Sequence, residues 1–177
     1  MTFSFYFYPE QLLFAFVKKS LITQSPDRND NLNINAACIF CCVAATEAIV
    51  NSLFIENKII EHYDEMGLRS KIETIALIGG LTIDWDKIPW LEINHLIKIR
   101  NWLTHYKISR DKSLGLANFD GWINKPNIDP LHEFTKNSVE KYYNSVRGGL
   151  VILVKGVSQD HNYSFLSDEK YESFLAG

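Results

Sequence analysis

Apolar residues recur along this chain at the three- and four-residue spacing of an α-helix, and this periodicity limits the possible folds more than any other feature. The longest such stretch covers residues 35–60. Side chains at this spacing lie on one face of a helix, whereas a strand needs strict alternation. The residues that form this face are Ile39, Val43, Ala44, Ala48, Ile49 and Leu53. The pattern predicts a long helix with one buried face.

Shorter segments predict further helices in the first half of the chain. Residues 3–22 fit a strand or a helix, and a helix is favoured from Pro9 because proline suits a first helical turn. Residues 24–33 are rich in Asn, Asp, Ser and Pro, which predicts a loop. A helix over residues 68–78 is expected to end at the glycine pair that follows it.

The second half of the chain predicts two more helices. Residues 89–107 carry an apolar stripe, and Pro89 stands near its start. Residues 109–131 contain two Gly and two Pro and are predicted to be a long loop. A helix is expected from about Leu131 to about residue 154, with the glycine pair at 148–149 kinking or ending it, and a small helix in the last twenty residues. The prediction is a single all-α domain over residues 1–177, a helical bundle with extra N-terminal and C-terminal elements.

Composition fits one ordinary globular domain with no overall attraction for nucleic acid. Of the 177 residues, 46% are hydrophobic and 22% charged, and the net charge is −3. A chain with this charge has no general basic field. It does have a local group of cations near residue 100, which is where binding of an anion is expected. They are Lys98, Arg100, Lys107, Arg110 and Lys112.

The cysteines and the apolar runs indicate a reducing compartment. Cys38, Cys41 and Cys42 are an odd number of thiols in one apolar stretch, without a second pair or a nearby His to complete a zinc site, and are expected to be small buried side chains. The N-terminal apolar run lacks a basic n-region and a cleavage site, which favours a packed helix over a signal peptide. We therefore expect a soluble cytoplasmic protein with no membrane partner, no metal and no cofactor.

The strongest chemical pattern is the string Arg100-Asn101-Trp102-Leu103-Thr104-His105. An Arg followed four to six residues later by His is expected by chance about 0.4 times in a chain of this composition, but an Arg followed directly by Asn and then by His at one fixed spacing only about 0.01 times. An Arg presents a fork of donors to phosphate oxygens, and an imidazole exchanges protons near neutral pH. Simpler interpretations exist for each residue alone. Arg100 can form a buried ion pair with a residue such as Glu47, His105 can cap a helix end, and Asn101 can be a surface amide.

Taken together, the residues resemble the HEPN superfamily of all-α domains found in prokaryotic toxins, defence systems and some RNases. The segment from Leu96 to Lys107, with Arg followed by Asn and then by His, is similar to that family's signature. Residues 44–54, with Glu47 and Asn51, and residues 70–84, with Lys71, resemble the family's upstream segments. The resemblance covers about residues 35–108, and the recognisable portion of the domain is about 35–155.

The resemblance implies a metal-independent endoribonuclease in which the RNA 2′-hydroxyl attacks the adjacent phosphorus and leaves a 2′,3′-cyclic phosphate. Arg100, Asn101 and His105 would be catalytic: His105 as general base or acid, Arg100 on the scissile phosphate, and Asn101 orienting one of them. Glu47 would support Arg100. Lys98 and Lys107 would bind RNA.

The family also implies partners. HEPN domains are typically homodimers whose two motifs face each other, and family members act as toxins paired with an antitoxin protein or in antiviral defence. The alternative is a catalytically inert HEPN scaffold that dimerises or binds RNA. A nucleotide-binding bundle is less favoured because no Gly-rich phosphate loop is present. The four tryptophans, Trp85, Trp90, Trp102 and Trp122, fit core packing better than base stacking.

Overall fold

The computed structural model describes residues 9–24, 28–59, 65–105, 130–158 and 161–166, and all regular elements within them are helices. The predicted all-α bundle is therefore confirmed for these residues. In chain order they are α1 (Pro9–Thr23), α2 (Arg28–Glu56), α3 (Leu68–Ile78), α4 (Trp90–His105), the short α5 (Pro130–Glu133), α6 (Lys136–Val157) and the 3₁₀ helix η4 (His161–Leu166).

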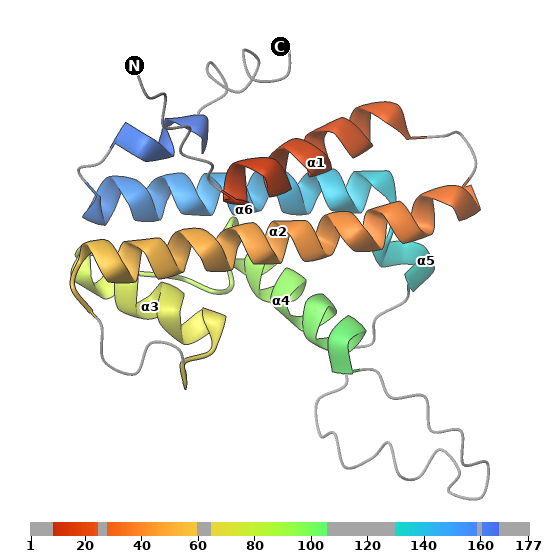
Figure 1. Cartoon of the computed structure of the whole chain (residues 1–177). Helices are drawn as coiled ribbons and strands as arrows, with labels where there is room; N and C mark the ends of the chain where they lie inside the picture. The colour runs from red at the N-terminus through yellow and green to blue at the C-terminus, as the bar shows by residue number, and fades with distance from the viewer. Residues whose placement is uncertain (1–8, 25–27, 60–64, 106–129, 159–160, 167–177) are drawn as a thin grey trace, which may run out of the picture.

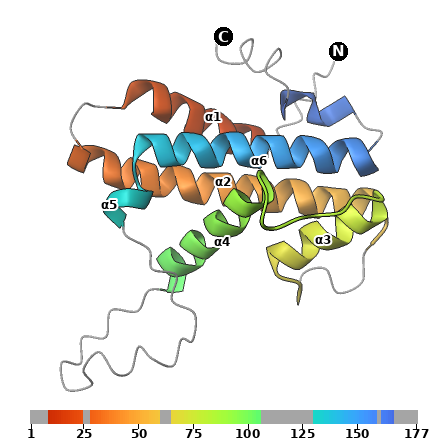
Figure 2. The ribbon, with the colours of Figure 1, turned by 180° about the vertical axis from the view of Figure 1, so that it is seen from behind.

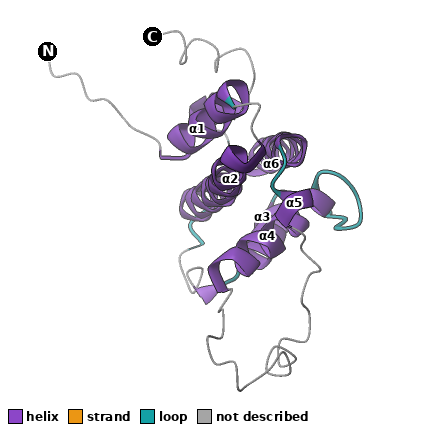
Figure 3. Ribbon diagram, turned by 90° about the vertical axis from the view of Figure 1, so that its right-hand side faces the viewer, coloured by secondary structure: helices purple, strands orange, loops and turns teal. Residues whose placement is uncertain are grey.

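Helices α2 and α6 lie side by side along the length of the bundle and form its middle layer (Figure 1, Figure 2). Helix α1 packs against them on one side, whereas α3 and α4 pack against them on the other (Figure 3). The apolar stripes of the helices meet in one continuous core. The face predicted for α2 is largely in it: Ile39, Ile49 and Leu53 are fully buried.

Helix α2 begins at Arg28, so the loop predicted over residues 24–33 is wrong from Arg28 onward. Asn and Asp are frequent in loops, but they are also favoured at helix N-termini. Tertiary contacts fix this end of the helix. Asn35 is almost fully buried, accepts a hydrogen bond from Gln24, and donates one from Nδ2 to the backbone oxygen of Phe134 at 2.8 Å.

The part of α2 from Asn31 to Glu56 is long and apolar enough to cross a membrane by length and composition. In the bundle α1, α3, α4 and α6 pack against this helix, and 56% of its apolar window is buried. The buried amide of Asn35 and the buried hydroxyl of Thr46, which donates to the Cys42 oxygen at 2.7 Å, lie within it. The cytoplasmic location stays a prediction.

Helix α6 runs without interruption through Gly148 and Gly149, although this glycine pair was expected to kink or end it. Gly149 is buried where α4 crosses α6. A Cβ atom there would lie 2.6 Å from Cδ1 of Ile93 and 3.2 Å from the Trp90 ring, whereas a Cβ on Gly148 would meet nothing within 4 Å. The glycine at 149 therefore permits the close packing of α4 on α6.

The single helix predicted from Leu131 is divided into α5 and α6, because Thr135 caps the second one. Its Oγ1 accepts a hydrogen bond from the Ser138 amide at 3.2 Å. The side chain of Glu133, the last residue of α5, points into the bundle. Its carboxylate accepts a hydrogen bond from the Tyr142 hydroxyl and lies 3.1 Å from Nε2 of His95 on α4. Glu133 thus joins α4, α5 and α6.

These contacts predict a stability difference that depends on pH. Burial raises the pKa of the Glu133 carboxyl, but the hydrogen bonds from Tyr142 and His95 outweigh it and lower the pKa below 4.5. A lowered folded-state pKa stabilises the protein above the unfolded-state pKa, and this contribution is lost as the pH falls through the folded value. We expect Glu133→Gln to be less stable than the wild type at pH 6 by about 1–2 kcal/mol.

The difference is expected to disappear as the pH falls through the lowered folded-state pKa of Glu133, where the carboxyl of the wild type becomes protonated. Urea unfolding followed by circular dichroism, from pH 6 downward, measures it. Glu140→Gln, an exposed position on α6, provides the control and should unfold as the wild type does at every pH. An equal loss of stability in Glu133→Gln at both ends of the pH range would contradict the role of the carboxylate charge.

Candidate functional site

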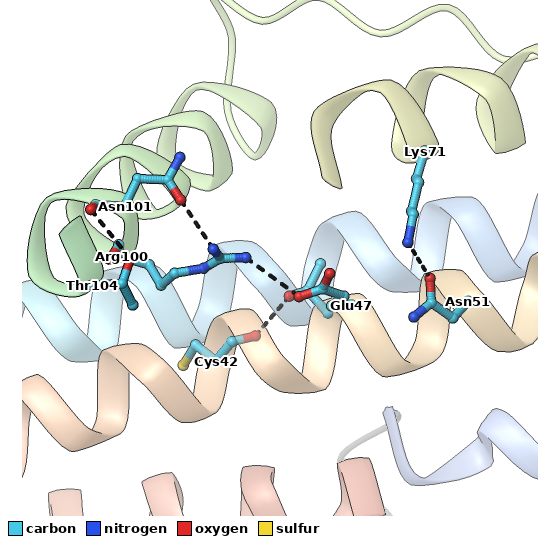
Figure 4. Close-up of polar contacts among 8 residues, drawn as sticks. Cys42, Glu47, Asn51, Lys71, Arg100, Asn101 and Thr104 are labelled. Carbon is cyan, nitrogen blue, oxygen red and sulfur yellow. Dashed lines mark hydrogen bonds and ion pairs between the residues drawn. The ribbon is translucent and has the colours of Figure 1, made fainter. Parts of the chain in front are cut away.

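The Arg100 side chain connects α4 to α2. It extends from α4 toward Glu47, and the distance between its Nη2 and Glu47 Oε2 is 3.4 Å (Figure 4). Its other terminal nitrogen, Nη1, donates to Oδ1 of Asn101 at 3.1 Å. The structure therefore brings together three of the residues that the sequence predicted for the site, one from α2 and two from α4.

The Arg100–Glu47 pair is half-buried rather than buried. The two side chains are 26% and 39% exposed, whereas Ile99, the residue before Arg100, is fully buried. An ion pair this exposed contributes about 0–1 kcal/mol to stability. The partner that the simpler interpretation named for Arg100, Glu47, is therefore the one that it contacts, but the pair is half exposed and adds little to the stability of the fold.

A shallow hollow of about 430 Å³ opens between α2 and α4 beside this pair. The α2 side is mainly apolar and ends at Glu47, whereas the α4 side is polar. The lining residues are Phe40, Val43, Ala44, Glu47, Arg100 and Thr104. The hollow thus places a cation with several hydrogen-bond donors at the edge of an apolar surface, an arrangement that can hold an anionic group attached to an apolar one.

A second cross-helix contact lies one turn farther along α2. Nζ of Lys71, on α3, donates to Oδ1 of Asn51 at 2.8 Å, and Lys71 is only 3% exposed (Figure 4). Asn51 follows Glu47 by four residues, so both side chains project from the same face of α2. A cationic side chain of α4 therefore contacts α2 at Glu47, and one of α3 contacts it at Asn51.

The other predicted site residues are Lys98 within α4, His105 at its end and Lys107 beyond it. His105 is the last residue of the helix, and its side chain lies outside the described part of the structure. Lys107 also lies outside the described residues, as do Arg110 and Lys112. Lys98 is exposed on α4. The roles predicted for His105, Lys98 and Lys107 accordingly stay predictions.

Sequence reasoning missed the cluster around Glu133, in which two histidines lie close to the same carboxylate. Besides His95, Nδ1 of His132 lies 3.5 Å from Glu133 Oε1, and Lys141 pairs with Glu92 nearby. Periodicity places His95 on a helix, but nothing in the sequence shows where α5 returns to the bundle. Among the described residues, no three His, Cys, Asp or Glu side chains are arranged so that they can hold a metal ion.

The cysteines show no feature of a reactive site. Cys38 and Cys42 are buried, as expected, whereas Cys41 is only partly buried, and all three are free thiols. Burial raises the pKa of Cys38 to about 11 and raises that of Cys42 well above its usual value. Because a thiolate is the nucleophilic form, these two thiols are inert near neutral pH.

Three tryptophans of the described region pack as expected. Trp90 is 7% exposed in the core, and Trp102 packs near Phe134 with their ring centroids 6.3 Å apart. Trp85 is also partly buried against the core, with its ring centroid 6.1 Å from that of Trp90, and the Arg69 guanidinium stands 4.6 Å from the centroid of its ring. Trp122 lies outside the described residues. None of the three described tryptophans lines the hollow beside Arg100.

Comparison with known proteins gives no match: no protein-family model, no curated protein and no solved structure is similar to this chain at a significant level. The resemblance to HEPN domains is therefore carried by the residues of the chain itself.

Proposed function

We propose that this protein is a metal-independent endoribonuclease of the HEPN type. The observation that carries the proposal is the position of Arg100. Its guanidinium is oriented by Glu47 and Asn101 at the rim of an open hollow, and His105 follows five residues later at the end of the same helix. A cation held in place for a phosphate, with an imidazole on the same helix, is what cleavage by a 2′-hydroxyl requires.

In the proposed reaction the ribose 2′-oxygen forms a bond to the adjacent phosphorus, and the bond from phosphorus to the 5′-oxygen of the next nucleotide breaks. One imidazole takes the proton of the 2′-hydroxyl, and a second gives a proton to the departing 5′-oxygen. Arg100 stabilises the negative charge that develops on the phosphoryl oxygens between these steps. The products are a 2′,3′-cyclic phosphate and a 5′-hydroxyl end.

The reaction uses two proton-transfer groups, whereas each chain supplies one His105. We propose that two copies form a symmetric homodimer in which the two motifs face each other, so that one His105 acts as the base and the other as the acid. The proposed biological setting is a toxin with a cognate antitoxin, or an antiviral defence system. The hollow beside Arg100 is open, which such an arrangement needs.

The decisive test is cleavage of total cellular RNA in the presence of EDTA, followed by analysis of the product ends. We expect 2′,3′-cyclic phosphate and 5′-hydroxyl ends, because the 2′-oxygen is the nucleophile. The same preparation carrying His105→Ala controls for a contaminating nuclease. Intact RNA after incubation with folded wild-type protein would favour the inert scaffold, and activity that EDTA abolishes would contradict the metal-independent mechanism.

A further inference from the structure

An aromatic ring stands in the hollow that contains Arg100. Phe40, on α2, is 38% exposed and lines the hollow together with Val43 and Ala44. Phe40 precedes Glu47 by seven residues, or about two helical turns, so both face the same side of α2 about 10 Å apart along its axis. Because Glu47 contacts Arg100, the ring and the guanidinium mark the two ends of one open surface.

We infer that Phe40 is a stacking platform for the base of an unpaired nucleotide whose phosphate is bound by Arg100. This inference rests on the proposed function and defines its substrate more closely. A nucleotide has a flat apolar base and a charged phosphate, and the hollow has an apolar wall on α2 and a cationic rim on α4. Phe40 and Arg100 line the same hollow, so one ligand can contact both side chains.

The ring selects unpaired RNA for a physical reason. In a duplex each base is stacked between its neighbours, so its face cannot lie on a protein ring, whereas the bases of loops and single strands are free to do so. Phenylalanine has no hydrogen-bonding group with which to read a base edge. Phe40 therefore gives a preference for single-stranded RNA without a strong preference among the four bases.

A nucleotide suits this surface better than an apolar partner does. The guanidinium of Arg100 carries five donors, and its two described contacts, with Glu47 and Asn101, use only part of that fork. A purely apolar surface seated on Phe40 would remove the charged rim from water without supplying acceptors, which is costly. Phosphate oxygens supply those acceptors in bidentate geometry.

The test measures binding separately from cleavage. The probe is a short fluorescent single-stranded oligouridylate with 2′-O-methyl riboses, which cannot be cleaved because its 2′-oxygen is blocked, and a 2′-O-methyl duplex serves as the comparison. Fluorescence anisotropy gives the affinity of full-length wild type, Phe40→Ala and Phe40→Trp. The control is Phe16→Ala. Phe16 is 45% exposed and belongs to α1, a helix that packs on the opposite side of α2 from α4 (Figure 3).

We expect Phe40→Ala to bind the single strand about 5- to 100-fold more weakly, the effect of removing one stacking platform. Phe40→Trp should bind at least as tightly as the wild type, and Phe16→Ala should be unchanged. Binding to the duplex should be weaker in the wild type and insensitive to Phe40. Equal affinity of wild type and Phe40→Ala for the single strand, or no binding by the wild type, overturns the inference.

The remaining outcomes separate this inference from the proposed function. Binding that depends on Phe40 in a protein that cleaves no RNA supports the nucleotide site and rejects the nuclease. If the wild type and Phe40→Ala both cleave RNA and have the same KM, the nuclease is supported and the stacking role of Phe40 is rejected. A third outcome is that Phe40→Ala has a lower molecular mass in solution than the wild type and that Phe40→Trp also loses RNA binding. This result assigns the ring to an interface between two copies of the chain and overturns the inference.

Discussion

Replacing Arg100 with alanine is expected to lower the rate of RNA cleavage by about 10²–10³-fold, the usual cost of removing one preorganised donor from a developing negative charge. The fold should survive, because the contact with Glu47 is half exposed and contributes at most about 1 kcal/mol. The measurement is a single-turnover rate on a fluorescent single-stranded RNA, with thermal unfolding recorded for each variant.

Arg100→Lys tests whether the fork of donors matters or only the charge. We expect it to recover little of the lost rate, because an ammonium cannot bind two phosphate oxygens in the same plane. Arg69→Ala is the matched control: it removes an exposed guanidinium from α3, where Arg69 contacts Glu73 and Trp85 and not the hollow. Full cleavage activity in Arg100→Ala would contradict the proposed role of this residue.

The largest stability effect is expected at Gly149. We expect Gly149→Val to lower the free energy of unfolding by about 2–3 kcal/mol, because the new side chain would enter space already filled by Ile93 and Trp90. Neither neighbour can move away easily, since Ile93 is 2% and Trp90 7% exposed. For a chain of this length the melting temperature should fall by about 4–12 °C.

Gly148→Val provides a control of the same composition one residue away. Its Cβ would meet nothing within 4 Å, and valine is a slightly better helix former than glycine. We therefore expect a melting temperature close to or slightly above that of the wild type, measured by differential scanning calorimetry. If the two variants melted together, helix propensity and not the contact between α4 and α6 would explain the glycine pair.

Periodicity predicted the helices well, and it failed where tertiary contacts decide. The helix over residues 68–78 has the predicted bounds because its apolar spacing and its terminal glycines agree. The N-terminal turns of α2 were predicted as loop because Asn and Asp suit both structures, and the contact of Asn35 with Phe134 lies far away in sequence. The glycine pair in α6 indicated a break because local propensity does not include the helix that packs against Gly149.

The candidate site could be predicted only in part. The string beginning at Arg100 gave residues that share one helix end. Glu47 was named both as a possible ion-pair partner of Arg100 and through the resemblance, and the structure places it 3.4 Å from Arg100. Phe40 was not predicted, since it is one of 11 phenylalanines and only the packing of α4 on α2 places it in the hollow. The cluster at Glu133 was missed for the same reason, because it forms between three separate helices.

The two cross-helix contacts on α2 make the geometry of the site independent of the connecting loops. Glu47 and Asn51 stand one turn apart on the same rigid helix, and each receives a cation from a different neighbour, Arg100 or Lys71. The spacing of the two acceptors, about 6 Å along the axis, is set by the helical rise of α2 and not by the segments that join α2, α3 and α4. Insertions in those connections can thus accumulate during evolution while the spacing between Glu47 and Asn51 is kept. One residue inserted between positions 47 and 51, by contrast, would rotate the two acceptors by about 100° relative to each other.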